Sequence, residues 1–140
     1  MTTPRQLIIA VLVALTAFSL FSCHPCAAKT TAAFYTPPYT PSRCYGNENH
    51  GVMVAAANED TLWDGGNACG KSYRVKCLSE GGGAAVQCRE GETVTVKIVD
   101  ICASRCRNTI DLSREAFATI AVLDEGKILG EQKISVSIEE

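Results

Sequence analysis

The stretch "VTVKIVDICASRCRNTIDLS", residues 94–113, decides how the chain is expected to fold. Its first half alternates apolar and polar side chains, the period-two pattern of a half-buried strand. The apolar face of that strand carries Val94, Val96 and Ile98. Two acids, Asp100 and Asp111, then flank a Cys-x₃-Cys motif. Whether these carboxylates form an acid/base pair is the question on which the function depends.

Three further segments are expected to be strands. "KSYRVKC" (71–77) and "KISVSIE" (133–139) alternate in the same way, and "GVMVAAA" (51–57) is an apolar run typical of a buried strand. Turn-forming segments rich in Gly, Pro and Ser separate them, at residues 36–42, 64–70 and 79–85. Many short strands of this kind indicate a small closed β-barrel.

One helix is expected after residue 113. Ser113 can cap its N-terminus and Glu115 favours its first turn. Three apolar residues fall on one face of this helix: Phe117, Ile120 and Ala121. The sequence therefore predicts a mainly β protein with one or two short helices.

The first 28 residues have the pattern of a secretory signal peptide. Arg5 is followed by an apolar run, Leu7–Phe21, and then by small residues before Lys29. The run of about 15 residues is shorter than the roughly 20 that a membrane-spanning helix needs. We expect cleavage after Ala28, within two residues. A retained anchor is the alternative.

The expected mature chain, residues 29–140, is long enough for one small domain. The formal net charge of the whole chain is −2, and loss of Arg5 makes it −3. No basic block or basic–aromatic stripe is present, so nucleic acid is not an expected partner. We expect a monomer that does not insert into the membrane once the signal is removed.

Six cysteines remain after cleavage: Cys44, Cys69, Cys77, Cys88, Cys102 and Cys106. An even number in a short secreted chain indicates three disulfides. A zinc site is the competing interpretation. His50 is the only histidine of the mature chain, however, and no paired Cys-x₂-Cys motifs remain. We therefore expect no metal and no cofactor.

Four blocks in order carry a family resemblance: "AAFYTPPYTPSRCYGN", "LWDGGNACGKSYRVKC", "VTVKIVDIC" and "TIDLSREAFATIA". They resemble the barwin/expansin-like domain named for family-45 endoglucanases (EG45), especially the plant natriuretic peptides and blight-associated proteins. The resemblance implies one six-stranded double-psi β-barrel over residues 29–140, with a groove across one face. It also implies the disulfides Cys44–Cys69, Cys77–Cys88 and Cys102–Cys106.

Hydrolytic members of that family need two carboxylates on either side of the scissile bond. The resemblance aligns Asp111 with their acid, although Thr109 and Ile110 replace a neighbouring histidine and aromatic residue. Their base lies near the first strand, where this chain reads "AAFYTPPY" without an acid. We therefore expect no hydrolytic activity, and Asp100 and Asp111 are interpreted as vestigial groove acids.

The resemblance extends to barrels with two other activities. Expansins loosen walls without hydrolysis, but Ala33 replaces a threonine that they retain, and their second domain has no counterpart before Glu140. The barrel of bacterial rare lipoprotein A is a lytic transglycosylase that needs a single acid, placed like Asp100. Such chemistry requires a carboxyl group with a pKa raised by burial.

The candidate binding residues of the groove are Tyr35, Tyr45, Asp100 and Asp111. Each has a structural alternative. Aspartates at strand ends and before helix caps often accept hydrogen bonds from backbone amides. Tyrosines often pack at a barrel rim.

The resemblance implies a secreted, apoplastic protein of the plant natriuretic peptide type, which acts on water and solute balance. In that family the activity is credited to the segment between the first two mature cysteines, here Arg43–Cys69. A membrane receptor is then the expected partner. The alternative is a module that binds or modifies cell-wall polysaccharide through the groove around Tyr35, Asp100 and Asp111.

Overall fold

The structure is a computed structural model that describes residues 4, 27–78, 86–102, 106, 108–123 and 132–140. The expected signal peptide lies almost entirely outside the described residues, as does the turn segment at 79–85. Strand β1 begins at Ala28, the position at which cleavage is expected. Within the described residues, no helix has the length and apolar character that crossing a bilayer requires.

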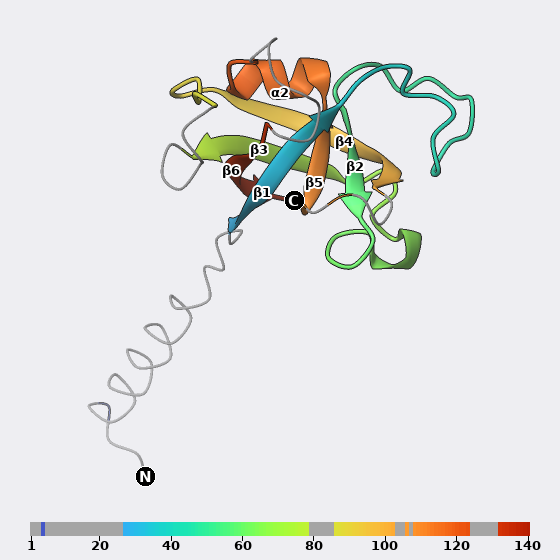
Figure 1. The fold of residues 1–140 in the computed structure, drawn as a ribbon. Coiled ribbons are helices and arrows are strands. Elements are labelled where there is room, and N and C mark those ends of the chain that lie inside the picture. Colours follow the sequence, from blue (N-terminus) through green and yellow to red (C-terminus); the bar gives the residue numbers. More distant parts are fainter. Residues whose placement is uncertain (1–3, 5–26, 79–85, 103–105, 107, 124–131) are drawn as a thin grey trace.

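Six strands close into a barrel in the order β1-β5-β2-β4-β3-β6 (Figure 1). Their bounds are β1 Ala28–Tyr35, β2 Val54–Asn58, β3 Ser72–Leu78, β4 Thr93–Cys102, β5 Ile110–Ser113 and β6 Ile134–Glu139. The pairs β1–β5 and β2–β4 are parallel, and the other four pairs are antiparallel. This topology confirms the mainly β, double-psi barrel.

The strand expected at residues 51–57 starts three residues later than the apolar run does. Gly51 has a positive φ of 80°, which interrupts the extended backbone. Val52 and Met53 precede the sheet and are exposed, at 45% and 42%. The register with β4 begins at Val54, which is opposite Lys97.

Helix α2, Arg114–Ile120, closes one side of the barrel (Figure 1). Its N-terminus is capped as expected, because the Ser113 hydroxyl accepts a hydrogen bond from the Ala116 amide. Phe117 is fully buried, and its ring centroid lies 5.0 Å from that of Phe34 on β1. A short 3₁₀ helix, η2, covers Asp64–Gly66.

The six cysteines of the expected mature chain form three disulfides. The pairs are Cys44–Cys69, Cys77–Cys88 and Cys102–Cys106, which is the pairing that the resemblance implies. They span sequence separations of 25, 11 and 4 residues. Each of them ties a loop to the barrel or closes a turn beside it.

Candidate functional site

The two acids lie on one row that crosses four neighbouring strands. Asp111 on β5 is in register with Ala33 of β1 and with Ala56 of β2, and Ala56 is in turn in register with Asp100 of β4. Residues in register point to the same face of a sheet. Ala33 and Ala56 are buried, at 3% and 6%, but they do not belong to the core cluster, so this row lies on the outer face of the barrel, under covering segments. Strand β2 lies between the strands that carry the two acids. At ordinary strand spacing their Cα atoms are therefore about 10 Å apart.

Tyr35 shares this outer face, because it lies two residues after Ala33 on β1. Its hydroxyl oxygen is buried and has no hydrogen-bond partner among the described residues. Burial raises the pKa of Tyr35, and the charges of Asp100 and Asp111 raise it further. Tyr35 therefore offers a neutral phenol, a hydrogen-bond donor without an acceptor, close to both acids.

Asp111 is half-buried at the centre of the row. Its Oδ1 accepts a hydrogen bond of 3.3 Å from Asn108 Nδ2, and its Oδ2 lies 3.0 Å from Cys102 Sγ. Burial raises the pKa of Asp111, while the Asn108 hydrogen bond and the Lys133 charge oppose this. A carboxyl group with a raised pKa keeps its proton at higher pH, as a proton donor requires.

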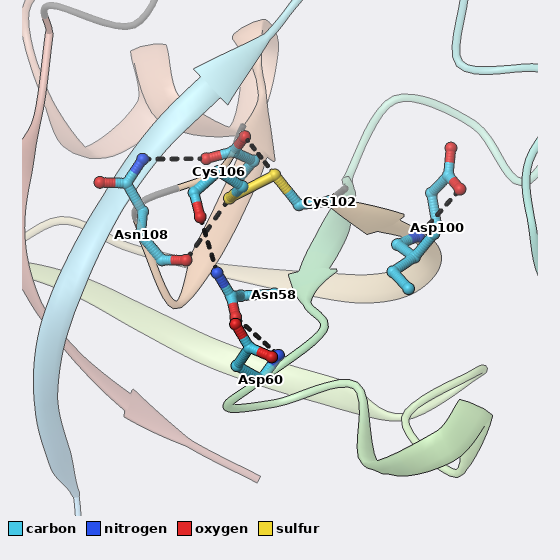
Figure 2. Close-up of a disulfide and its surroundings, with 8 residues drawn as sticks. Asn58, Asp60, Asp100, Cys102, Cys106 and Asn108 are labelled. Carbon is cyan, nitrogen blue, oxygen red and sulfur yellow. Dashed lines mark hydrogen bonds between the residues drawn. A yellow bond between two sulfur atoms is a disulfide. The ribbon is translucent and has the colours of Figure 1, made fainter. Parts of the chain in front are cut away.

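The side chain of Asp100 accepts hydrogen bonds from backbone amides. Its Oδ1 accepts hydrogen bonds from the amides of Arg43, at 3.0 Å, and of Ile101, at 2.8 Å. Figure 2 shows its side chain turned away from the Cys102–Cys106 disulfide. Asp100 therefore fixes the start of the loop at Arg43, in keeping with the structural alternative for an aspartate near a strand end.

Tyr45 lies in a different cluster from the other three candidate binding residues. Its ring centroid is 3.9 Å from that of His50, and Lys97 Nζ lies 5.7 Å from the same tyrosine centroid. His50 Nδ1 is 3.2 Å from Lys97 Nζ, and its Nε2 is 3.0 Å from Glu48 Oε1. No periodic pattern in the sequence indicates this cluster, because its members come from the loop before β2 and from β4.

Cys102, Cys106 and Asp111 bring three potential metal-ligand atoms within 4.8 Å of one another. The two sulfurs are bonded to each other, however, so neither is available as a thiolate. In this oxidised state the cluster does not offer a zinc-type ligand set.

Asp111→Asn is expected to raise the stability of the protein at neutral pH. Burial raises the folded-state pKa of Asp111 above the unfolded-state pKa of 3.8. The stability that comes from this difference is fully present below pH 3.8 and is lost as the pH rises through the folded-state pKa. Asparagine cannot ionise, and its side-chain oxygen can still accept the Asn108 hydrogen bond. Thermal unfolding should give a higher Tm for the variant at pH 7 and a smaller difference at pH 3. A lower Tm for the variant at pH 7 would contradict this account.

Two plant proteins are similar to this chain over most of its length. An EG45-like domain containing protein from Citrus jambhiri is 52% identical over 113 residues, which is 80% of this chain and 85% of the relative. The chain belongs to the EG45-like domain proteins. The EG45-like domain containing protein 2 of Arabidopsis thaliana is 43% identical over 102 residues, 73% of this chain and 76% of the relative.

The barrel of this EG45-like protein also matches a broader family model, described as lytic transglycolase, over residues 55–131. Among solved structures, the apo expansin of Clavibacter michiganensis is similar with a TM-score of 0.56 and 22% identity. A mutant of that expansin in complex with cellohexaose matches with a TM-score of 0.52 and 22% identity. Both matches cover 81% of this chain and 49% of the expansin chain, so the EG45-like protein spans about half of the expansin's length. At this identity the likeness concerns the fold alone.

Proposed function

We propose that this EG45-like protein is a secreted, extracellular recognition protein of the plant natriuretic peptide type. It acts in water and solute homeostasis by binding a membrane receptor, and it neither hydrolyses nor loosens wall polysaccharide. One observation supports the non-hydrolytic part: Oδ1 of Asp100, the other acid of the row, accepts hydrogen bonds from the amides of Arg43 and Ile101, which favours a structural role for this carboxylate.

Inverting hydrolysis needs a proton donor and, about 6.5–9.5 Å away, a base that activates water. Asp111 fits the first role, because burial raises its pKa. Asp100 is the other acid of the row, but its Oδ1 is taken up by two backbone amides, and the remaining positions are Ala33 and Ala56. The neutral Tyr35 phenol cannot serve as a base either. This arrangement supports one proton donor, Asp111, and a structural role for Asp100.

The recognition element of this proposal is the segment Arg43–Cys69. Its two ends are bound to adjacent residues of β4: the Cys44 amide donates to the Val99 carbonyl, and the Gly70 amide donates to the Ile98 carbonyl, both at 2.9 Å. The Cys44–Cys69 disulfide closes the loop at this base. Figure 1 shows the chain between β1 and β2 projecting from one side of the barrel. A loop that is fixed at both ends loses less conformational entropy when it binds.

The exposed surface of this segment includes Val52 and Met53, exposed at 45% and 42%. Their backbone is held in place, because the Ser113 hydroxyl donates to the Val52 carbonyl and the Lys97 amide donates to the Met53 carbonyl. Exposed apolar side chains on an ordered backbone are suited to bury themselves against a partner protein. We assign this pair to the receptor contact.

Val52→Asp is expected to reduce the potency of the protein in a protoplast-swelling assay by about tenfold or more, because it places a charge in a buried contact. The measurement is the dose–response curve of the purified mature chain. Val122→Asp is the matched control, since Val122 is exposed at 40% but follows α2, outside the segment. The control should keep its full potency. Equal potency of the two variants would remove Val52 from the recognition surface.

A second candidate function is binding of cell-wall polysaccharide in the groove. It is favoured by the position of Tyr35, whose aromatic side chain lies on the same outer face of the barrel as both acids. The similar expansin fold seen with cellohexaose supports the same ligand class. If a transglycosylase-like reaction with one acid took place here, Asp111 would suit the role better than Asp100. Calorimetry with cellohexaose would test this function, and Tyr35→Phe should weaken any binding.

A further inference from the structure

The Cys102–Cys106 disulfide differs from the other two in the length of its loop. Its sequence separation is 4 residues, against 25 and 11. The unfolded-state entropy that a disulfide removes grows with loop length, so this one contributes least to stability in that way. Cys102 is the last residue of β4 and is half-buried. We therefore expect the barrel to stay folded when this bond is opened.

The sulfur of Cys102 lies 3.0 Å from Asp111 Oδ2. A disulfide sulfur carries no proton, so a hydrogen bond at this contact requires the carboxyl group to be protonated and to donate. A thiol at the same place would instead donate its own proton to a carboxylate. The preferred protonation state of Asp111 therefore depends on whether the disulfide is closed or open.

We propose that Cys102–Cys106 is a redox-modification site, and that its reduction by small thiols places the Cys102 thiol against Asp111 as a hydrogen-bond donor and so favours the carboxylate form of Asp111. The chemical partner is a thiol of low molecular mass. The consequence reaches the outer row directly, because Asp111 is one of its two acids. A closed disulfide favours a proton donor at this position, and an open one favours a negative charge.

The reaction balances as two thiol–disulfide exchanges. A thiolate attacks the half-buried Cys102 sulfur, a mixed disulfide forms, and Cys106 leaves with the electron pair and takes a proton from solvent. A second thiolate attacks the reductant's sulfur in that mixed disulfide. Cys102 then leaves with the electron pair and takes the proton of the adjacent Asp111 carboxyl group. The products are two protein thiols, one Asp111 carboxylate and the oxidised reductant.

Other charged groups around Asp111 do not change with the redox state. Tyr35 faces it from β1, with a raised pKa that keeps its phenol neutral, and Lys133, whose charge lowers the pKa of Asp111, precedes β6. The residue of β2 in register with it is Ala56, which does not titrate. On β4, the charge of Asp100 also raises the pKa of Tyr35, and Asp100 Oδ1 accepts hydrogen bonds from backbone amides in either redox state. The sulfur of Cys102 is thus the redox-dependent neighbour.

The test equilibrates the mature chain with reduced and oxidised dithiothreitol between about pH 4 and pH 7, approached from both directions. Differential alkylation and peptide mass spectrometry then give the reduced fraction of each cysteine pair. When the pH is below the thiol pKa values, exchange with dithiothreitol neither takes up nor releases protons. Its equilibrium constant is then independent of pH unless another group releases a proton. If Asp111 releases one, reduction of Cys102–Cys106 becomes more favourable as pH rises, by about tenfold in total for a pKa difference of one unit.

The wild-type chain should show this rise for Cys102–Cys106, and the Cys77–Cys88 pair of the same molecules should not. In Asp111→Asn the equilibrium constant of Cys102–Cys106 should be flat. A flat wild-type profile, or the same rise in Asp111→Asn, would overturn the proposal.

Two non-reducible variants test the same coupling without any reductant. The double serine variant, Cys102→Ser with Cys106→Ser, keeps a hydroxyl beside Asp111 that can donate a hydrogen bond. The double alanine variant, Cys102→Ala with Cys106→Ala, removes that donor. Carboxyl ¹³C NMR should give a pKa of Asp111 that is lower in the serine pair than in the alanine pair, by about one unit. Equal values in the two variants would show that the group at position 102 does not control Asp111.

Discussion

Replacing Cys44 and Cys69 together by alanine is expected to abolish the swelling response of the protein. The disulfide joins the two ends of the Arg43–Cys69 segment where they meet β4, so its loss removes the covalent link between the parts of the proposed recognition segment on either side of β2. The free energy of unfolding should also fall by about 3–4 kcal/mol, the expectation for a loop of this length. Potency in the protoplast assay and urea denaturation of the same preparation measure the two effects.

A matched variant separates loss of shape from loss of stability. Cys77→Ala with Cys88→Ala opens a disulfide of separation 11, outside the recognition segment, at a cost of about 3 kcal/mol. At a temperature where both double variants are folded, this control should keep its potency, and Asp111→Asn should keep it as well. If potency followed stability equally in both disulfide variants, the segment would have no special role.

Phe117→Ala is expected to lower the free energy of unfolding by about 3–5 kcal/mol. The ring is fully buried, packs against Phe34 at 5.0 Å between centroids, and attaches α2 to the barrel. Such a loss is a large share of the total stability of a domain of this size. Reversible urea denaturation measures it. Ile120→Val, at an equally buried position of the same helix, should cost only about 0.5–1.5 kcal/mol.

A cost for Phe117→Ala close to that of Ile120→Val would mean that α2 contributes little to the core. It would also weaken the interpretation of the outer row, because Phe34 lies between Ala33 and Tyr35 on β1. The position of that strand depends on the ring contact below it.

The strands with a clear alternation were predictable from the sequence alone. Residues 94–98 and 134–138 alternate buried and more exposed side chains in the structure as they do in the sequence. Strand β5 could not be found in this way, because its four residues are too few to show a period. The apolar character of residues 51–53 was misleading, since Gly51 turns the backbone before the sheet begins.

The site was predictable in part, and only through the resemblance. It named Tyr35, Asp100 and Asp111, which the fold brings to one face. It could not indicate that Asp100 binds backbone amides, because the Arg43 amide is 57 residues away in sequence. The contact of Asp111 with the Cys102 sulfur was likewise not predictable, since it depends on how the chain turns between β4 and β5.

The most direct test of the account is whether the protein cuts polysaccharide. The purified mature chain, with all three disulfides intact, would be incubated at high concentration with cellulose, xyloglucan, mannan and peptidoglycan, and new chain ends would be measured. Because Asp100 is held by backbone amides in a structural role, we expect no release above a heat-denatured control. Release that disappears in Asp111→Asn would contradict the account and make the protein an enzyme.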